Sequence, residues 1–470
     1  MINTKALREK ILDLAMRGKL VPQDPTDEPA SVLLDKIKEE KEQLIKDKKI
    51  KKEKALPEIS KEEIPYEIPD SWEWVSIRDI STITMGQAPK SSNVNNEGNG
   101  FEFHQGKTFF SSMYVEQSGV YTMSPNKVIN PPAIIMSVRA PVGDVNLIDR
   151  KIVIGRGLAA FVPGNGIELL FLYNYLQTQK SYLLSLSTGT TFKAINSQTV
   201  RTINVPLPPL KEQKRIVAKL EELFALIDTI ESNQLEFKQL AEQLDKKVLD
   251  LAMRGKLVPQ DPTDEPASVL LDKIKEEKEQ LIKDKKIKKE KALPEISKEE
   301  IPYEIPDSWE WTRLGDSIQL LSGRDLTNDQ YSNKETGIPY ITGASNFSCN
   351  HIDSVRWTES PKVEAVKGDI LLTVKGTVGS IAILTMDKVH IARQIVAIRN
   401  ITKKIDSKYV YWFISYYVKY LQRASKGVIP GISRKDILDA IMPIPPLNEQ
   451  KRIVTKIEMI RESIQRIDFE

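Results

Sequence analysis

Two stretches have residue types that could do chemistry, but each lacks a partner that the chemistry needs. Asn130-Pro131-Pro132 begins like the motif in which amino-methyltransferases stack an aromatic side chain on a flipped base, yet Ala133 follows it. No glycine-rich turn for S-adenosylmethionine follows a clear first strand, so a turn before a strand is the favoured interpretation. Gly106-Lys107-Thr108 ends like a phosphate loop, but Phe101 stands where that loop requires a glycine.

Metal and nuclease chemistry find no better support in the sequence. The three histidines, His104, His351 and His390, are not at metal-ligand spacing with one another or with Cys349, the single cysteine. No carboxylate–lysine cluster of a nuclease stands out. The sequence therefore predicts a chain without a catalytic or metal site of its own.

Polar and cationic side chains in loops rich in Gly, Asn and Ser fit nucleic-acid contacts better, because base edges and phosphates are read by such groups. In the first half the candidates are Lys90, Ser91, Ser92, Asn95, Gln105, Lys107, Arg139 and Lys193. In the second half they are Arg324, Thr342, Asn346, Lys375 and Lys426. For each of them, a solvated polar loop is the alternative reading, and the bases read cannot be deduced.

These candidates lie in two basic segments. Residues 75–203 hold 11 Lys and Arg against 7 Asp and Glu, and residues 312–440 hold 18 against 12, although the whole chain carries only +3. Basic segments suit an anionic partner such as nucleic acid. One cysteine in 470 residues excludes an internal disulfide, and no apolar run is long enough to span a membrane, so we expect a cytoplasmic protein of several domains.

The two basic segments are embedded in a long repeat. The 63 residues from Leu12 to Trp74 recur without change from Leu249 to Trp311, an offset of 237. The offset persists outside this block, since PLPPLKEQKRIV at Pro206 matches PIPPLNEQKRIV at Pro443 and IGRG matches IARQ. Short β-branched runs broken by Gly, Pro and Asn turns, with helices near 168–186 and 407–424, predict an α+β domain in each half.

A long heptad pattern follows each basic segment and predicts helices that pair. Apolar residues at spacings of four and three run for about five heptads after Lys211, with Gln234 as the one polar member. The second seam begins near Ile453 and continues at the N-terminus, which predicts an antiparallel coiled-coil pair and a pseudo-twofold relation of the halves. The predicted seam residues are Leu7, Ile11, Leu14, Ile216, Leu220, Leu223, Ile227, Ile230, Leu244, Val248, Leu251, Ile453, Ile457, Ile460, Ile464 and Ile467.

Several motifs and their order resemble the specificity subunits of type I restriction–modification systems. The motifs are LAMRGKLVPQDP with DEPAS, EIPDSWEW before each basic segment, and the PPLKEQKRIV or PPLNEQKRIV helix start after it. One stretch of the first basic segment is also similar to that family, namely MGQAPKSSNVNNEGNGFEFHQGK. The resemblance covers essentially the whole chain.

The resemblance implies a non-catalytic subunit that recognises double-stranded DNA. Each basic domain would read one half of a bipartite site, while the helices set the spacing and dock two methyltransferase subunits, with restriction subunits joining the full complex. S-adenosylmethionine would belong to the methyltransferase, and ATP and Mg to the restriction subunit. The expected parts are an N-terminal helical region (1–55), a recognition domain (56–210), a central helical region (211–292), a second recognition domain (293–447) and a C-terminal helix (448–470).

Two other readings stay open from the sequence. A coiled-coil scaffold that binds only proteins would keep the heptads and the duplication without DNA specificity. A self-contained methyltransferase is disfavoured because the cofactor motif is missing.

Overall fold

The computed structural model divides the chain into two units, each with its own apolar core: the N-terminal unit, Ile2–Gln234, and the C-terminal unit, Leu235–Glu470. It describes residues 2–47, 59–188, 193–289, 291–348, 351–424 and 431–469. Helix α7 (Leu210–Met253) supplies its first part to one unit and its last part to the other. No helix in these ranges is long and apolar enough to cross a membrane.

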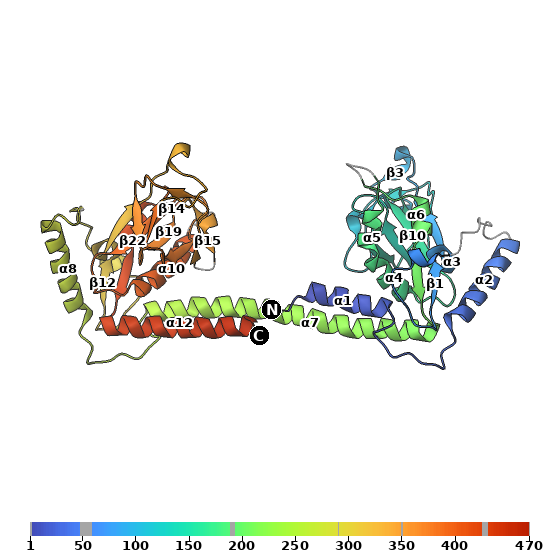
Figure 1. Cartoon of the computed structure of the whole chain (residues 1–470), viewed down its shortest axis with the longest axis horizontal. Coiled ribbons are helices and arrows are strands. Elements are labelled where there is room, and N and C mark those ends of the chain that lie inside the picture. Colours follow the sequence, from blue (N-terminus) through green and yellow to red (C-terminus); the bar gives the residue numbers. More distant parts are fainter. Residues whose placement is uncertain are drawn as a thin grey trace. The chain divides into compact units, whose positions relative to one another are not determined.

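The N-terminal unit is α+β and contains two main sheets (Figure 1). One sheet has the order β2-β10-β7-β8 and the other β3-β5-β4-β9-β6, in which β4 and β9 are parallel. Strands β1 and β11 form a separate ribbon beside the start of α7. The strands are β1 (Glu73–Ser76), β2 (Ser81–Met85), β3 (Val94–Asn95), β4 (Phe101–His104), β5 (Tyr121–Thr122), β6 (Val128–Ile129), β7 (Ala133–Ser137), β8 (Val145–Ile148), β9 (Ile152–Ile154), β10 (Leu158–Pro163) and β11 (Asn204–Leu207).

The C-terminal unit repeats this topology with different side chains. Its sheets have the orders β13-β22-β19-β20 and β17-β14-β21-β18, β14 and β21 are parallel, and β12 pairs with β23. Strands β15 and β16 form an additional hairpin. The strands are β12 (Glu310–Arg313), β13 (Ile318–Ser322), β14 (Ile338–Ile341), β15 (Phe347–Ser348), β16 (His351–Ile352), β17 (Trp357–Thr358), β18 (Glu364–Val366), β19 (Ile370–Thr373), β20 (Ile381–Ile383), β21 (Lys388–Ile391), β22 (Ile395–Asn400) and β23 (Ile441–Ile444).

Helices pack on these sheets and join them to the repeated block. The helix expected near residues 168–186 is present as two consecutive helices, whereas its counterpart near 407–424 is one continuous helix. The described helices of four or more residues, apart from α7, are α1 (Thr4–Met16), α2 (Ala30–Lys46), α3 (Ile77–Ile80), α4 (Leu169–Thr178), α5 (Lys180–Ser185), α6 (Ser197–Arg201), α8 (Ala267–Lys283), α9 (Leu314–Ser317), α10 (Ser407–Ala424), α11 (Arg434–Leu438) and α12 (Leu447–Phe469).

The described parts of the two copies of the repeated block fold in the same way. Gly18 and Gly255 end their helices with φ near +67°, and a Cβ on either would lie 2.4 Å from the Cγ of a proline in the same copy. Glycine is required at both positions because an L side chain would be strained and would collide. Identical letters therefore carry identical local constraints in the two units.

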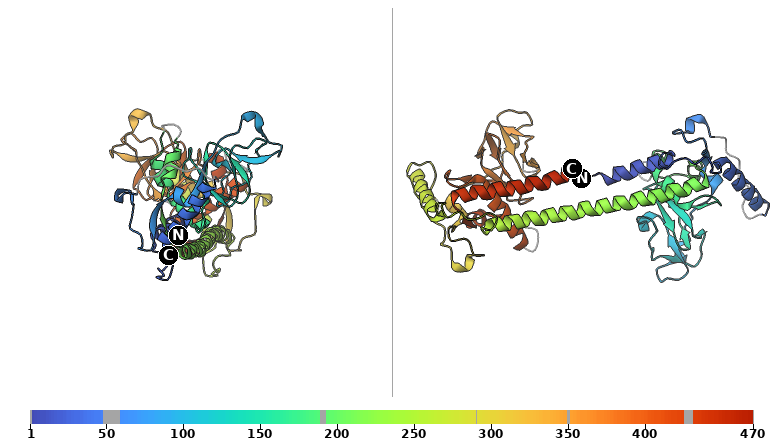
Figure 2. Two further views of the ribbon diagram at one scale, coloured as in Figure 1. Left: turned by 90° about the vertical axis from the view of Figure 1, so that its right-hand side faces the viewer. Right: turned by 90° about the horizontal axis from the view of Figure 1, so that it is seen from below.

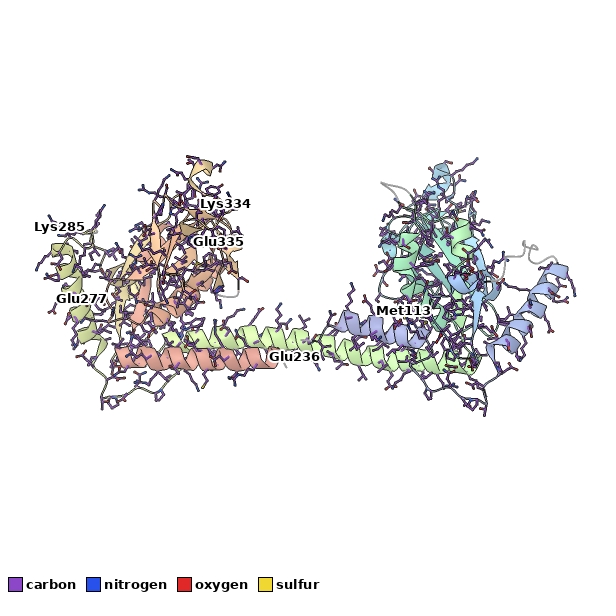
Figure 3. The ribbon with its side chains drawn as sticks, viewed as in Figure 1. Met113, Glu236, Glu277, Lys285, Lys334 and Glu335 are labelled. Atoms are coloured by element: carbon purple, nitrogen blue, oxygen red, sulfur yellow. The ribbon has the colours of Figure 1, made fainter. Side chains whose placement is uncertain are left out.

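The predicted helix pairing is present within each unit. Antiparallel packing of α1 on the start of α7 follows from two contacts, because Gln234 donates to the carbonyl of Ile2 over 3.3 Å and Arg8 pairs with Asp228. Helix α12 lies antiparallel to the end of α7 in Figure 1 and in the right-hand view of Figure 2. The seam residues that are buried there are Ile11, Ile216, Leu220, Ile227, Val248, Ile453 and Ile457.

The other seam residues are less covered. Those that are half-buried are Leu7, Leu14, Leu223, Ile230, Leu251, Ile460 and Ile464. Leu244 differs from the expectation, since it is 46 % exposed. The difference lies in the partner helix. In the N-terminal unit α7 has Phe224 at this position, whereas α12 has Arg461 at the equivalent position, and its guanidinium stacks over Trp412. The side chain of Ile467 lies outside the described residues.

Candidate nucleic-acid interface

Four strands of the N-terminal unit end at one place, and their exits are joined by backbone hydrogen bonds. The amide of Gln87, after β2, donates to Ile154 over 3.0 Å, and the amide of Gly155, after β9, donates to His104 over 2.7 Å. The amide of Val138, at the end of β7, donates to Gly157 over 2.9 Å. We call the exposed side chains on these exits, Gln87, Gln105, Arg139 and Arg156, the N-terminal loop cluster.

The C-terminal unit builds the same framework. The amide of Arg324, after β13, donates to Ile391 over 3.0 Å, and the amide of Ala392, after β21, donates to Ile341 over 2.9 Å. The amide of Val374 donates to Gln394 over 2.8 Å. The C-terminal loop cluster therefore consists of the side chains on these exits: Arg324, Thr342, Lys375, Arg393 and Gln394.

Glycines allow the strand exits to approach one another. A Cβ on Gly155 would lie 2.5 Å from Oε1 of Gln105, and a Cβ on Gly343 would lie 2.6 Å from Oε1 of Gln394. In each unit a glutamine thus faces a glycine across the parallel strand pair. The glutamine follows β4 in the N-terminal unit but β21 in the C-terminal unit, so the same framework presents a different chemical surface.

The two clusters also differ in how they hold an arginine. Arg156 and Arg393 occupy equivalent positions at the offset of 237, and both are exposed. Nε of Arg393 lies 2.8 Å from the carboxylate of Asp325, whereas Ala88 stands at the position equivalent to Asp325. Within the described part of the chain, no ion pair involves Arg156, so its guanidinium is available to an anion or a base edge.

Several predicted contact residues lie on the clusters. Gln105, Arg139, Arg324, Thr342 and Lys375 are cluster members, and Lys193 is adjacent because Ala194 pairs with Arg139 in an isolated bridge. The structure thus brings together residues that are distant in the sequence.

Other predicted residues take part in local structure. Lys90, Ser91 and Ser92 lie on a short 3-10 turn outside the joined exits, and the side chain of Asn95 binds the backbone of Glu97 and Asn99.

Asn346 corrects an expectation. Its side chain is only 6 % exposed, accepts hydrogen bonds from the amides of Thr342 and Gly343, and donates to the carbonyl of Asp353. Because these bonds fix the loop after β14, Asn346 supports the exit and does not present its amide to a ligand. Lys426 lies outside the described residues.

Lys107 forms part of a small charged hollow below the N-terminal loop cluster. Its ammonium pairs with Asp144, which also lies 2.5 Å from the ammonium of Lys180. Burial alone would raise the pKa of Asp144, but its hydrogen bonds to the two lysines lower it below the usual value. These residues and Tyr173 line a hollow of about 420 Å³. The charge of Lys107 is thus partly compensated within the unit.

A buried ion network supports the exit of β4. Glu102 accepts from Arg150 at 2.7 Å, from the amide of Ser118 at 2.8 Å, and lies 2.8 Å from Nε2 of His104. Burial raises the pKa of Glu102, but these bonds outweigh it and lower the pKa to about 2. The network thus fixes the carboxylate of Glu102 on β4, three residues before Gln105.

The stretches that first suggested catalysis lie beside regular elements of the fold. Asn130-Pro131-Pro132 leads directly into β7, and Gly106-Lys107-Thr108 enters a 3-10 turn. Among the described residues, no group of three His, Cys, Asp or Glu could hold a metal ion.

Four cluster residues were not predicted from the sequence: Gln87, Arg156, Arg393 and Gln394. A signal was present in the offset of 237, which aligns IGRG with IARQ and leaves arginine as the shared polar residue. Its exposure could not be read from the letters, because Arg156 is flanked by buried neighbours on both sides.

Comparisons with known proteins give one consistent result. The family model described as "Type I restriction modification DNA specificity domain" matches residues 69–237 and 306–467. The specificity subunit of the type I restriction enzyme EcoAI of Escherichia coli is 29 % identical over 544 aligned residues, covering 99 % of this chain and 90 % of that protein. The putative specificity subunit MjaX of Methanocaldococcus jannaschii is 41 % identical over 194 residues, which are 41 % of this chain and 44 % of that protein.

Solved structures support the same fold. A chain from a structure described as "Structural basis underlying complex assembly and conformational transition of the type I R-M system" aligns with a TM-score of 0.62 at 21 % identity, covering 86 % of this chain and 93 % of that one. The HsdS subunit from Thermoanaerobacter tengcongensis aligns with a TM-score of 0.55 at 20 % identity, covering 86 % and 92 %.

Proposed function

Because the chain belongs to the type I restriction modification DNA specificity domain family, we propose that its two loop clusters each read one half of a bipartite DNA site. The observation that supports this proposal is that both units have the same backbone framework but carry different side chains on it. Four strand exits are joined in the same way in both units, while the glutamine, the arginine partner and the lysine positions differ. A shared framework with different exposed side chains is what we expect of two domains that have the same fold and recognise different bases.

The side chains of the clusters have the chemistry that base reading requires. Arginine binds guanine through two hydrogen bonds and glutamine binds adenine in the same way, each contact discriminating by about 1–3 kcal/mol. Both residue types are exposed on each cluster, on rigid strand ends. We assign Lys193 and Lys375, which are exposed, to phosphate contacts that would fix the register of each unit on the duplex.

The repeated block is assigned to partner binding. Where both copies are described, its identical residues form the same helices and turns in the two units and therefore offer two equivalent surfaces, which suits two copies of one methyltransferase subunit. Restriction subunits would join that assembly. We assign methyl transfer and cleavage to these partners, with S-adenosylmethionine bound by the methyltransferase and ATP with Mg by the restriction subunit. Such a target places the chain in the prokaryotic cytoplasm, where the chromosome lies.

Selection from a random DNA library tests the proposal. The chain is reconstituted with its methyltransferase subunits, incubated with the library, and the bound DNA is sequenced. We expect a bipartite motif with an unread gap, and an affinity that falls steeply with added salt as counterions are released from phosphates. One contiguous motif, or binding without sequence preference, would count against the proposal.

A further inference from the structure

The 63-residue repeat raises a question of pairing between copies of the chain. Because the repeated blocks are identical, they cannot tell the two units apart. Any information that decides which helix pairs with which must lie outside the block. The nearest unlike residues are those of α1 before Leu12 and the corresponding residues of α7 before Leu249.

In the N-terminal unit, the cation is on α1. The guanidinium of Arg8 pairs with Asp228 on α7, lies 3.6 Å from the carboxylate of Glu231 and stacks 5.2 Å from the ring centre of Phe224. The side chain of Arg8 is 29 % exposed and that of Asp228 is 69 % exposed, so the guanidinium lies partly within the helix contact and the carboxylate lies at its solvent-exposed edge. Helix α1 therefore contributes positive charge and the first part of α7 negative charge.

In the C-terminal unit, the signs are reversed. The residue equivalent to Arg8 is Asp245, which pairs with Arg461 on α12 and lies 3.0 Å from the ammonium of Lys419. Arg461 also stacks 4.1 Å from the ring centre of Trp412. The last part of α7 is thus the acidic member of its pair, and α12 is the basic one.

An exchange of helices between the pairs would place like charges together. Helix α1 on α12 would bring Arg8 to Arg461, because Arg461 is equivalent to Phe224, and would replace its partner Asp228 by the uncharged Gln465, while Asp468 stands at the position of Glu231. The last part of α7 on the first part of another α7 would bring Asp245 to Asp228 and Glu231. Like charges at such partly buried positions oppose association, whereas the observed pairs attract.

We propose that these inverted charges are a pairing code that prevents a second copy of this chain from exchanging helices with the first. The surface concerned is the helix contact around Arg8 and Asp245, and the partner it rejects is the wrong half of an identical chain. The consequence is that both unlike loop clusters stay in one particle. This inference rests on the ion pairs and on the repeat, and it holds whether or not the clusters read DNA.

Co-expression of two differently tagged full-length chains tests the pairing code. The double variant Arg8→Asp with Asp228→Arg keeps an ion pair in the N-terminal unit but gives it the polarity of the other unit. We expect capture of one tag to recover the second tag at background level for the wild-type chain and at least fivefold more for this variant. The matched control, Arg8→Lys with Asp228→Glu, keeps the original polarity and should stay at background.

A restoring variant makes the test specific for polarity. Adding Asp245→Arg, Arg461→Asp and Lys419→Glu to the double variant inverts the second pair as well, so the two units differ again. Exchange should then return to background. Exchange by the double variant equal to that of the wild-type chain, or no return in the restoring variant, would overturn the proposal.

Salt gives a second measurement that needs no substitution. Raising ionic strength from about 0.1 M to about 1 M shortens the Debye length from about 10 Å to about 3 Å. Purified wild-type chains with different tags should then exchange more after mixing. A rate that is unchanged or lower at high salt would contradict a code based on charge.

Discussion

Trp72 donates its indole N–H to the buried carboxylate of Glu212 over 3.0 Å, which joins the end of the repeated block to the start of α7. Gln23 donates to the other oxygen of the same carboxylate at 2.5 Å. The C-terminal unit repeats this arrangement, with Trp309 donating to Glu449 over 3.0 Å. In both units this carboxylate therefore joins the tryptophan near the end of the repeated block to the first turn of a long helix, α7 or α12.

Removing this carboxylate should destabilise each unit by the same amount. Glu212→Ala and Glu449→Ala each leave a buried indole N–H without an acceptor, which costs about 1–3 kcal/mol. Because the surroundings are nearly identical in the two copies, urea unfolding should give matching losses. Exposed Glu310→Ala serves as a control and should change the free energy of unfolding by less than about 0.5 kcal/mol. Losses that differ widely between the copies would show that the two sites are not equivalent.

Acid should weaken the N-terminal unit through Glu102. The pKa of this carboxyl is lowered from 4.5 to about 2 in the folded chain, so its stabilising contribution is fully present above 4.5 and is lost as the pH falls towards 2. Glu102→Gln should remove this component and flatten the dependence of the unfolding free energy on pH in that window. Glu97→Gln, at an exposed loop position, should leave the curve unchanged. A wild-type curve that is flat between pH 4.5 and 2 would contradict the assignment.

Arg150 should matter more than its partner. Arg150→Ala leaves Glu102 as a buried carboxylate without its main cation, and breaking such a pair costs about 3–5 kcal/mol. The measurement is thermal or urea unfolding at neutral pH. Glu102→Gln should cost clearly less, because it removes the buried charge itself. Equal losses for the two variants would mean that the carboxylate is not desolvated.

Neighbouring residues of α7 provide a test of the helix seam. Ile227 is 2 % exposed and Leu226 is 54 % exposed. Ile227→Asp should place a charge in the contact with α1 and lower stability by several kcal/mol, on the order of 3 or more. Leu226→Asp should change it by less than about 0.5 kcal/mol. Thermal unfolding that does not distinguish the two variants would show that the seam is not buried.

Much of this architecture could be predicted from the sequence because the same pattern of strands, turns and helices occurs twice, 237 residues apart. The offset of 237 aligns the strand exits, and RAPVGD and KGTVGS, one residue out of step, place Gly143 and Gly379 at turns that both have positive φ. The heptads predicted the extent of α7, which begins at Leu210 and ends at Met253. Local pattern and periodicity were sufficient for these features.

The remaining features depend on contacts that the letters do not contain. Asn346 is polar and lies in a loop, yet the loop folds back on its side chain and buries it. Arg393 is held by Asp325, 68 positions earlier, and nothing local distinguishes it from the unpaired Arg156. Leu244 fits the heptad, but on the facing helix α12 the guanidinium of Arg461 stacks on Trp412 and does not cover it. For Arg393 and Leu244 the partner comes from another element, and for Asn346 it comes from the fold of its own loop.

The arginines of the two clusters should differ from phosphate-binding lysines in their effect on DNA binding. Arg156→Ala should cost about 1–3 kcal/mol and relax selectivity at one base position of one half-site, and Arg393→Ala should do the same in the other half. Lys193→Ala should weaken binding to all sequences alike and lower the salt slope by about 1. Library selection with each reconstituted variant separates these outcomes. A uniform loss for Arg156→Ala would place its guanidinium on a phosphate.

The length of α7 should set the number of base pairs between the half-sites. Seven residues inserted between Gln234 and Phe237 lengthen a helix by about 10.5 Å and rotate it by only about 20° from whole turns, so both helix faces stay in register. The added length equals about three base pairs, since ten base pairs rise about 34 Å in one turn. Those base pairs also turn the duplex by about 100°, so a gap longer by about three base pairs is expected together with weaker binding. Both half-site sequences should be unchanged in library selection, because no cluster residue is altered. Two residues inserted at the same place would rotate the helix by about 200°, and should abolish selection of any bipartite motif. A heptad variant that selects the original spacing would show that the helix does not measure the gap.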